Sequence, residues 1–209
     1  MLMVRGYDTL CRAERRGMRD RDIRGCLRQD LLRHFAHDPG SLVLDELDLC
    51  QGTSRVDMAV VNGWIHGYEI KSEQDTLERL PGQMDVYSRT LDYVSIVTND
   101  RHLGAISALV PSWCGLTRAS LESDEVRLDV VRPPQQNTGI DAEAIVQFLW
   151  RDEALGILAS LGLDRGMASK PRRALWKNLS ESVPLDELQS LVRTALKDRQ
   201  GWRSDSLQT

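Results

Sequence analysis

Two carboxylates and a lysine lie close together within an apolar stretch that spans residues 55–71. Glu69 and Lys71 are two positions apart in a run that predicts a β-strand, so their side chains project from the same face. Asp57 belongs to the preceding apolar run, which predicts a neighbouring strand. A buried carboxylate is costly without a partner, and a metal ion together with an ammonium group would compensate both acids. These residue types predict a Mg²⁺-dependent phosphodiesterase.

The turn between the two strands decides whether the carboxylates share a face. The Asn-Gly pair between them is a strong hairpin signal, but a two-residue loop would put Asp57 and Glu69 on opposite faces. A three-residue loop over 61–63, with Gly63 in the left-handed conformation, would set Asp57 diagonally beside Glu69. A β-bulge at Gly67 would also bring them to one face. A shared site therefore requires an odd-length turn or a bulge.

The composition is that of a globular protein, with 209 residues, 41% hydrophobic and 28% charged. This length can bury a substantial core, enough for one domain with an appendage or for two small domains. No apolar run approaches the roughly 18–20 residues of a membrane span, and no apolar segment follows the arginine-rich N-terminus as in a signal peptide. The four cysteines are dispersed without a Cys-x-x-Cys spacing, which is typical of reduced thiols. We therefore expect a cytoplasmic protein that does not interact with a membrane.

The net charge of −4 is unevenly distributed along the chain. Residues 1–36 carry nine Arg or Lys and five Asp or Glu, whereas residues 165–203 carry nine and four. The middle of the chain, 37–164, carries nine and 21. An acidic centre between basic segments is what a metal site flanked by phosphate-binding arms would show. A mixture of solvated helix faces would give the same distribution.

Hydrophobic periodicity and turn signals predict an α/β protein with a helical tail. The expected elements are helix 20–35, strands 42–47, 55–61 and 64–71, helix 81–91, strand 93–98, helix 102–110, a strand pair within 113–131, and helices 141–161, 171–179 and 185–196. The polar, Pro-rich segment 132–139 predicts a linker. It divides the chain into a domain over residues 1–131 and a helical C-terminal region over 140–209.

The residues of the two strands resemble the PD-(D/E)XK nuclease superfamily, which includes many restriction endonucleases and RecB-type exonucleases. Asp57 matches its first acid, and Glu69 and Lys71 match its (D/E)-x-K motif. Val56 stands in place of the proline of the superfamily name, at a position that the chemistry does not use. The resemblance implies a restriction-endonuclease-like fold, with a mixed sheet flanked by helices and an αβββαβ core, followed here by the helical appendage.

A second motif narrows the resemblance to the RecB-like branch. Gln83 and Tyr87 follow the catalytic strand in a predicted helix and match its Gln-x-x-x-Tyr motif. The stretch 45–87 is similar to a family of small bacterial proteins in this superfamily. The resemblance covers roughly residues 20–131 and leaves the helical tail outside.

The resemblance implies a role for each residue of the strand motif. Asp57 and Glu69 would hold Mg²⁺, for which Mn²⁺ could substitute, and the carbonyl oxygen of Ile70 would be a further ligand. Lys71 would orient or help to deprotonate the attacking water and offset charge in the transition state.

Other positions could support this chemistry. Glu46, on the preceding strand, is expected to be an additional acid that binds a metal or positions water, with Asp22 on the first helix as the alternative. Gln83 and Tyr87 lie four residues apart on one helical face, where they could orient Lys71 or contact a phosphate. A packed tyrosine and a solvated glutamine are the simpler interpretation.

We therefore expect a metal-dependent nuclease that hydrolyses phosphodiester bonds of nucleic acid, DNA rather than RNA, as an endonuclease or an exonuclease. Four basic residues of the tail are candidates for contacts with the nucleic-acid backbone: Lys170, Arg172, Arg173 and Lys177. Solvated helix faces explain them equally well, and the helical region could instead form a homodimer or bind a protein partner. Two alternatives remain, a catalytically idle nuclease fold that binds nucleic acid or a partner protein in defence or repair, and an unrelated α+β interaction module.

Overall fold

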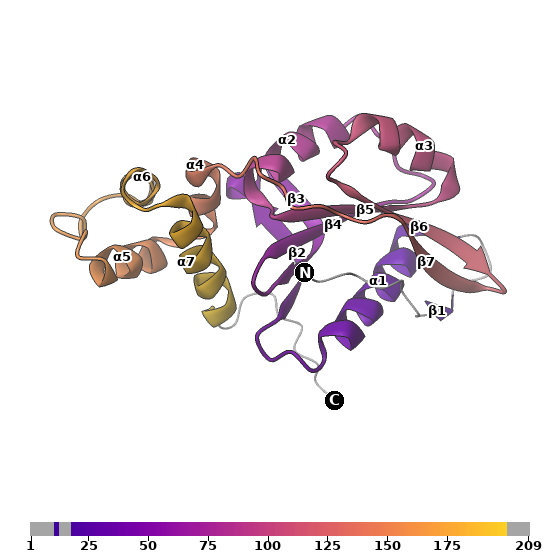
Figure 1. Ribbon diagram of the computed structural model, residues 1–209, viewed down its shortest axis with the longest axis horizontal. Coiled ribbons are helices and arrows are strands. Elements are labelled where there is room, and N and C mark those ends of the chain that lie inside the picture. The colour runs from indigo at the N-terminus through magenta and orange to yellow at the C-terminus, as the bar shows by residue number, and fades with distance from the viewer. Residues whose placement is uncertain (1–10, 13–17, 200–209) are drawn as a thin grey trace.

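The computed structural model of the protein describes residues 11–12 and 18–199. Strands and helices alternate through the first part of the chain and only helices follow (Figure 1). The elements are β1 (Cys11–Arg12), α1 (Asp20–Phe35), β2 (Leu42–Leu49), η1 (Cys50–Gly52), β3 (Ser54–Val61), β4 (Ile65–Lys71), α2 (Leu80–Thr90), β5 (Tyr93–Thr98), α3 (Asp100–Leu109), β6 (Gly115–Glu122), β7 (Glu125–Arg132), α4 (Ala142–Ile145), η2 (Val146–Phe148), α5 (Arg151–Ser160), α6 (Arg172–Ser182) and α7 (Leu185–Asp198). None of the helices in this described part of the chain is long and apolar enough to cross a membrane.

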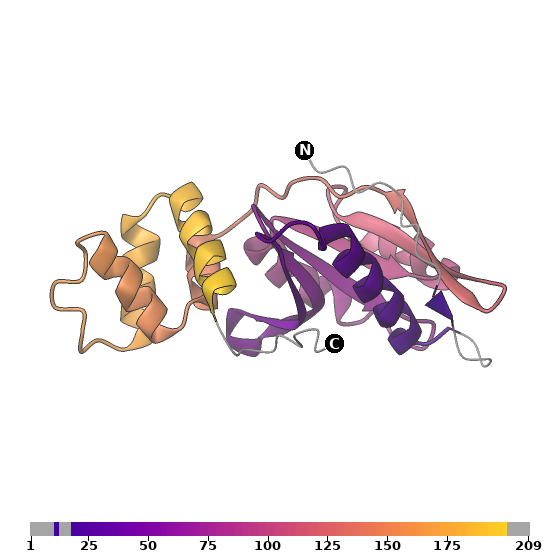
Figure 2. The same cartoon turned by 90° about the horizontal axis from the view of Figure 1, so that it is seen from below.

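A mixed sheet forms the centre of the α/β part, with the strand order β1-β7-β6-β5-β4-β3-β2 among the described residues. β4, β5 and β6 run parallel, and the other neighbours are antiparallel. α1 covers one face of the sheet, and α2 and α3 cover the other (Figure 1; Figure 2). The prediction of an α/β protein with a mixed sheet flanked by helices is confirmed, and so is the order α-β-β-β-α-β from α1 to β5.

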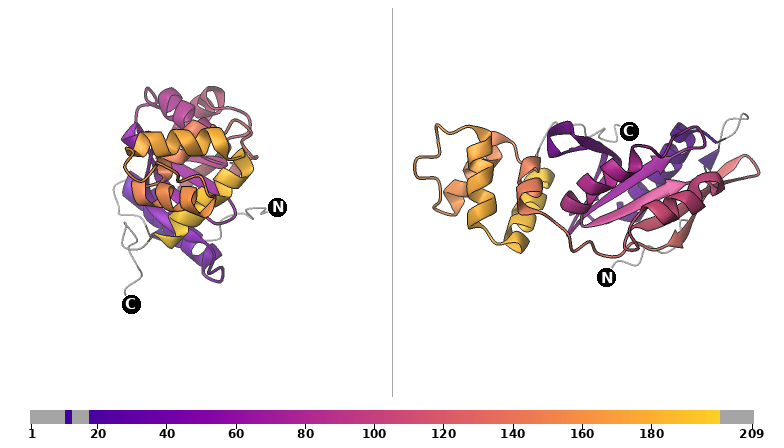
Figure 3. Two further views of the ribbon diagram at one scale, coloured as in Figure 1. Left: turned by 90° about the vertical axis from the view of Figure 1, so that its left-hand side faces the viewer. Right: turned by 90° about the horizontal axis from the view of Figure 1, so that it is seen from above.

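Two apolar layers hold the helices to the sheet. In the smaller layer, Ile23, Leu27 and Leu31 of α1 pack against the sheet residues Met58 and Tyr68. The larger layer lies under α2 on the opposite face and continues without interruption into α4–α7. These C-terminal helices lie beyond one end of the sheet (Figure 3). They therefore share a core with the α/β part.

The segment after β7 is irregular in conformation but is fastened to the α/β part. Asn137 lies in the predicted linker 132–139 and is only 4% exposed. Its side-chain amide donates to the carbonyl oxygens of Ser88 and Leu91, at 2.7 and 2.9 Å. Its backbone N–H donates to the carbonyl oxygen of Asp92 at 2.8 Å. The connection to the helices thus runs along the end of α2 and is held there.

The hairpin of β3 and β4 differs from the prediction in its register. Val61 pairs with Ile65, so the three-residue turn covers 62–64 rather than 61–63. Gly63 does not adopt a positive φ, so the predicted left-handed conformation is wrong. The turn still has an odd length, which is the property that a shared face requires.

Gly67 forms no β-bulge and pairs with Ala59 in the regular register. A Cβ atom at this position would lie 2.6 Å from Cδ1 of Leu91 and 3.2 Å from Cγ2 of Val56. Glycine is needed here because the end of α2 approaches the strand closely, and not because the strand bends.

The predicted helix over 141–161 is interrupted, so that prediction is wrong. Leu149 has an extended backbone with ψ of 133°, and α5 begins after Trp150. The backbone N–H of Trp150 donates to the carboxylate of Glu153 at 2.7 Å and thereby ties the start of α5. Apolar spacing continues across the break, which is why periodicity alone predicted one helix.

Asp92, just before β5, joins the helical region to the sheet. Its carboxylate accepts hydrogen bonds from the backbone N–H of Ile65 at 2.7 Å and from Gln189 at 3.0 Å. Nη1 of Arg193, in α7, lies 3.2 Å from Oδ2 of Asp92. The side chain of Asp92 is 3% exposed and that of Arg193 is 14% exposed. Burial raises the pKa of Asp92, whereas the N–H of Ile65 and the Arg193 guanidinium oppose that rise. The ionised form therefore depends on these partners.

We predict that Arg193→Gln lowers the free energy of unfolding by about 2–4 kcal/mol, because it leaves a buried carboxylate without its cation. Urea denaturation followed by circular dichroism measures the change. Lys177→Gln is the control, because it breaks an exposed pair with Glu181 at 3.7 Å and should cost less than about 0.5 kcal/mol. Equal stabilities of the two variants would contradict the role given to Asp92.

Candidate functional site

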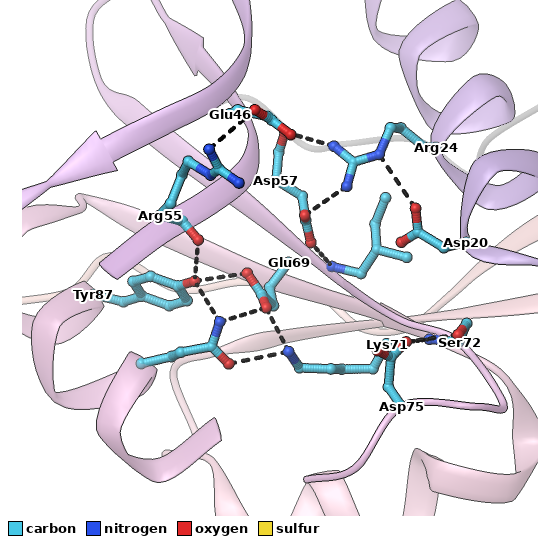
Figure 4. A network of polar contacts seen from close by, with 12 residues as sticks. Asp20, Arg24, Glu46, Arg55, Asp57, Glu69, Lys71, Ser72, Asp75 and Tyr87 are labelled. Carbon is cyan, nitrogen blue, oxygen red and sulfur yellow. Dashed lines mark hydrogen bonds and ion pairs between the residues drawn. The ribbon is translucent and has the colours of Figure 1, made fainter. Parts of the chain in front are cut away.

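The sheet opens between β3 and β4 at the residues that could do chemistry. The paired residues of these two strands end at Met58 and Tyr68. Beyond this point β3 remains paired with β2, and β4 remains paired with β5. Asp57 bridges the opening, because its Oδ2 accepts the backbone N–H of Ile70 at 2.7 Å (Figure 4). The side chain thus replaces a backbone hydrogen bond that the diverging strands no longer make.

A cavity of about 760 Å³ occupies this opening. Its wall contains five of the predicted site residues: Asp57, Glu69, Ile70, Lys71 and Gln83. The remainder of the wall comes from α1, from the turn between β2 and β3, and from the loop that leads into α2. The residues of the strand motif therefore line one cavity.

The alternation of side chains slips by one residue beside the cavity. Leu44 and Leu47 of β2 face the same core layer although they are three residues apart, a separation that normally changes face. Between them Glu46 adopts a φ of 54°, in the left-handed region that is costly for residues other than glycine. The register of β2 and β3 pairs Asp45 with Met58 and Leu47 with Val56, and it leaves Glu46 and Asp57 unpaired between them. Val56 and Ala59 of β3 also face this layer although they are three residues apart, so the alternation slips at Asp57 as it does at Glu46.

Glu69 and Lys71 form an ion pair at 2.5 Å, with side chains that are 4% and 5% exposed. Two residues of α2 complete the network (Figure 4). Gln83 accepts a hydrogen bond from Lys71 at 3.0 Å and donates to Oε1 of Glu69 at 2.7 Å. The Tyr87 hydroxyl donates to Oε2 of Glu69 at 2.6 Å. Buried ion pairs are stable only with such additional hydrogen bonds, so Gln83 stabilises this pair and is more than a solvated residue.

Burial and a neighbouring charge act together on Glu69. Burial raises the pKa of Glu69, and the Asp57 carboxylate raises it further, whereas Lys71 and the Tyr87 hydroxyl stabilise the charged form. Burial also raises the pKa of Tyr87, so its hydroxyl keeps the proton that it donates. The cavity therefore holds two like charges close enough to repel each other.

The first helix contributes two residues that the sequence analysis missed, one in the cavity wall and one in contact with a cavity acid. Nη2 of Arg24 lies 2.6 Å from Oδ1 of Asp57, and its Nε lies 3.4 Å from Oδ1 of Asp20. Asp20 lines the cavity, and burial raises its pKa. Arg28, one turn further along α1, pairs with Asp45 at 2.9 Å. The spacing of four residues between these three helical positions is a signal for one helical face.

Two predicted acids lie away from the others. Glu46 pairs with Arg55 at 3.2 Å, with 46% and 50% of the two side chains exposed, and does not line the cavity. Asp22 accepts a backbone N–H at the start of α1 at 2.9 Å and serves as a helix cap. The additional acids in the cavity wall are instead Asp20, Asp48, Asp75 and Glu78.

The basic tail residues gather around a second cavity of about 450 Å³. Arg173 and Lys177 line it together with Gln51, which belongs to the turn after β2. Arg172 reaches the same turn, with Nη2 3.4 Å from the side-chain oxygen of Gln51. Lys170 precedes α6 and is exposed. Because the next residue of that turn lines the first cavity, the two cavities flank one short turn.

The carboxylate oxygens in the first cavity are the type of ligand that a hard divalent cation prefers. Mg²⁺ prefers oxygen ligands and keeps several waters, so one or two carboxylates are sufficient. All four carboxylate oxygens of Asp57 and Glu69 already accept a hydrogen bond from the protein, and Oε1 of Glu69 accepts two. The other three oxygens each keep a second lone pair. Within residues 11–12 and 18–199, no group of three or more His, Cys, Asp or Glu residues is arranged to hold a metal ion. A cation here would depend on two carboxylates, water and substrate.

The sequence matches the family described as bacteriophage P4 protein cII over residues 21–209. The chain belongs to this family. Protein cII of Enterobacteria phage P4 is 24% identical over 157 residues, which is 75% of this chain, and the chain spans 59% of the length of that relative. A solved structure, the SPO1766 protein of unknown function from Silicibacter pomeroyi, is 20% identical and covers 68% of this chain and 90% of its own. Its TM-score of 0.39 supports no argument about fold or function.

The stretch of the chain that matches the P4 protein cII family contains nearly the whole site. All residues of the first cavity wall except Asp20 lie within the matched stretch. The match also includes α4–α7. The cavity and the helical region are therefore parts of one family unit.

We predict that Tyr87→Phe destabilises the protein by about 1.5–3 kcal/mol at about pH 8, because it removes a buried donor to a charged carboxylate. Without that donor the pKa of Glu69, which burial already raises, should rise further. As the pH falls through this pKa, Glu69 becomes protonated and the charged form no longer needs the donor. The loss should therefore shrink toward about pH 5, which urea denaturation at both pH values measures.

Tyr93→Phe is the matched control for this prediction. It removes the same atom from a tyrosine outside the Glu69 network, whose ring packs edge-on against Trp64 with the ring centres 5.8 Å apart. Its effect should stay within about 0.5 kcal/mol at both pH values. A loss in Tyr87→Phe that did not change with pH would contradict the link to Glu69.

Proposed function

We propose that this member of the P4 protein cII family is a metal-dependent nuclease with a restriction-endonuclease-like core. One observation carries the proposal. The opening between β3 and β4 brings Asp57, Glu69 and Lys71 to one cavity. Their strand positions and spacing match the motif of PD-(D/E)XK nucleases, and Gln83 and Tyr87 contact that motif as a Gln-x-x-x-Tyr helix would.

The ligand set suits one hard divalent cation, Mg²⁺ or Mn²⁺. Asp57 and Glu69 would hold it, with the carbonyl oxygen of Ile70 as a further ligand, and water and substrate oxygens would fill the other positions. Bound there, the cation would polarise the scissile phosphate and lower the pKa of a water molecule. Asp20 is better placed than Glu46 to act as the additional acid, because it lines the cavity.

Lys71 is the group that would act on the attacking water. Its ammonium is held between Oε1 of Glu69 and the side-chain oxygen of Gln83, which fixes its place in the cavity. A preorganised cation in a partly shielded site stabilises developing negative charge better than water does. Gln83 and Tyr87 bind the acid and the lysine, so they are positioning residues.

Nucleic acid is the proposed substrate because cations line both cavities, and a divalent cation would partly neutralise the six carboxylates that line the first. Arg55 and Arg79 line the first, and Arg173 and Lys177 line the second. A phosphodiester strand that crosses the short turn between the cavities would meet these cations in succession. DNA is proposed rather than RNA, from the resemblance to DNA nucleases. Cys26, Cys50 and Cys114 are free thiols, which fits the reducing cytoplasm that we propose for such an enzyme.

A catalytically idle protein that binds nucleic acid or a partner through the same fold is the second candidate. It is favoured by the full set of hydrogen bonds on Asp57 and Glu69, which satisfies both carboxylates by protein groups alone. An idle protein and a nuclease differ in whether substrate is cleaved when a divalent cation is supplied.

We predict Mg²⁺- or Mn²⁺-dependent cleavage that depends on the three motif residues. Asp57→Asn and Glu69→Gln should abolish it, and Lys71→Met should lower it by roughly 10²–10⁴-fold, the usual contribution of a proton-transfer group. These near-isosteric variants are preferable to alanine, because Glu69 and Lys71 are a buried pair. The assay compares linear, nicked, branched and single-stranded DNA with RNA.

Asp85→Ala is the control for the cleavage assay. Asp85 lies on α2 between the two positioning residues, but its side chain is 73% exposed and pairs with Arg89. It should cleave like the wild type. Activity that persisted in EDTA or in Asp57→Asn would mean that the cleavage comes from a contaminant or from another mechanism.

We predict that replacing Lys170, Arg172, Arg173 and Lys177 together by glutamine weakens nucleic-acid binding about equally across sequences. Each phosphate contact contributes roughly 0.9 to the slope of log affinity against log salt for B-DNA, so the slope should flatten by up to about 3–4. Cleavage at saturating substrate should change little. Fluorescence anisotropy across salt concentrations measures the slope.

Arg127→Gln is the control for the tail, because this exposed arginine lies on β7 and pairs with Asp129 and Glu122. Its salt slope should equal that of the wild type. An unchanged slope in the fourfold variant would assign the helical region to a homodimer or to a protein partner instead.

A further inference from the structure

Arg24 binds the first acid of the cavity from the side of α1 (Figure 4). Its Nη2 lies 2.6 Å from Oδ1 of Asp57, and its Nη1 lies 3.1 Å from the backbone carbonyl oxygen of the same residue. Its remaining nitrogen, Nε, lies 3.4 Å from Oδ1 of Asp20. The side chains of Arg24 and Asp57 are 27% and 24% exposed. One guanidinium thus spans two cavity acids and remains accessible to solvent.

The positive charge of Arg24 offsets the repulsion between Asp57 and Glu69. Lys71 does not fill this role, because its ammonium is held by Glu69 and Gln83. A divalent cation bound at Asp57 would supply the same compensation more strongly. Two cations in contact with one carboxylate oxygen repel each other, and the repulsion is large in a partly buried site. The arginine and a metal ion therefore compete for Oδ1 of Asp57.

We propose that Arg24 is an internal counter-cation, which neutralises Asp57 in the metal-free protein and leaves Oδ1 when a divalent cation binds. This inference rests on the metal site of the proposed function. Asp20 lies one helical turn away and already contacts the guanidinium, so it keeps the displaced arginine at the cavity edge. Arg24 thereby sets the concentration of metal at which the site fills.

A purely structural role, in which the arginine clamps α1 to the sheet, applies equally to Arg28. Nε of Arg28 lies 2.9 Å from Oδ2 of Asp45, and both side chains are 30% exposed. Asp45 does not line the cavity. The two arginines share a helix, a helical face and the same chemistry, but one pair includes a cavity acid and the other does not. Arg28 is therefore a matched control for both charge and clamping.

The test measures Mn²⁺ binding to the full chain without nucleic acid, by the electron paramagnetic resonance signal of free Mn²⁺. Arg24→Gln should bind Mn²⁺ roughly tenfold more tightly than the wild type, the scale of one charge-assisted hydrogen bond lost to competition. Arg28→Gln should stay within about twofold of the wild type, because Arg28 is paired with Asp45, which does not line the cavity. Asp57→Asn should bind Mn²⁺ more weakly than the wild type and the two arginine variants.

Equal Mn²⁺ affinities of the wild type, Arg24→Gln and Arg28→Gln would overturn the inference and leave the metal site intact. An absence of Mn²⁺ binding in every protein would overturn the inference, and the cleavage assay would then decide the proposed function on its own. If Arg24→Gln does not fold, NMR spectra of the wild type test the inference instead. Mg²⁺ should shift the side-chain Nε–H resonance of Arg24 in NMR spectra and leave that of Arg28 in place. An Arg24 resonance that did not move at saturating Mg²⁺ would overturn the inference.

Discussion

The buried ion pair of Glu69 and Lys71 places demands on the rest of the structure. Both side chains lose nearly all contact with water, so they stay ionised only if other groups replace the lost hydrogen bonds. α2 meets this demand with Gln83 and Tyr87, which are one helical turn apart. The helix can approach closely enough because Gly67 has no side chain where the end of α2 packs on β4. The polar network and the apolar packing of α2 therefore depend on each other.

The opening of the sheet has a cost that the site residues partly offset. β3 and β4 give up backbone pairing beyond Met58 and Tyr68, and the carboxylate of Asp57 takes one of the orphaned N–H groups. The backbone strain of Glu46 lies at the same level of the sheet. Strained residues persist where the surrounding structure enforces them, and they cluster at functional sites. A continuous sheet would have kept these strands paired and left no space for a cavity.

The C-terminal helices belong to the same structural unit as the sheet. One apolar layer runs through both, Asp92 ties α7 to the sheet, and the family match includes the two parts together. The second cavity adjoins the first for this reason, because α6 is packed against the turn that follows β2. Any substrate path across the two cavities would be built by segments that are far apart in the sequence.

The sequence by itself determined the order of the elements and the strand positions of Asp57, Glu69 and Lys71, because hydrophobic periodicity and turn residues act over a few neighbouring positions. It also determined that the turn must have an odd length, since side chains alternate along a strand. The tertiary structure alone decided the exact register of the hairpin, the break in the helix after η2 and the neighbours of each acid. Arg24 reaches Asp57 across 33 residues of chain, and Glu46 turns away through a backbone kink that no local pattern signals. Such contacts depend on how whole elements pack against one another, which pairwise spacing along the chain does not encode.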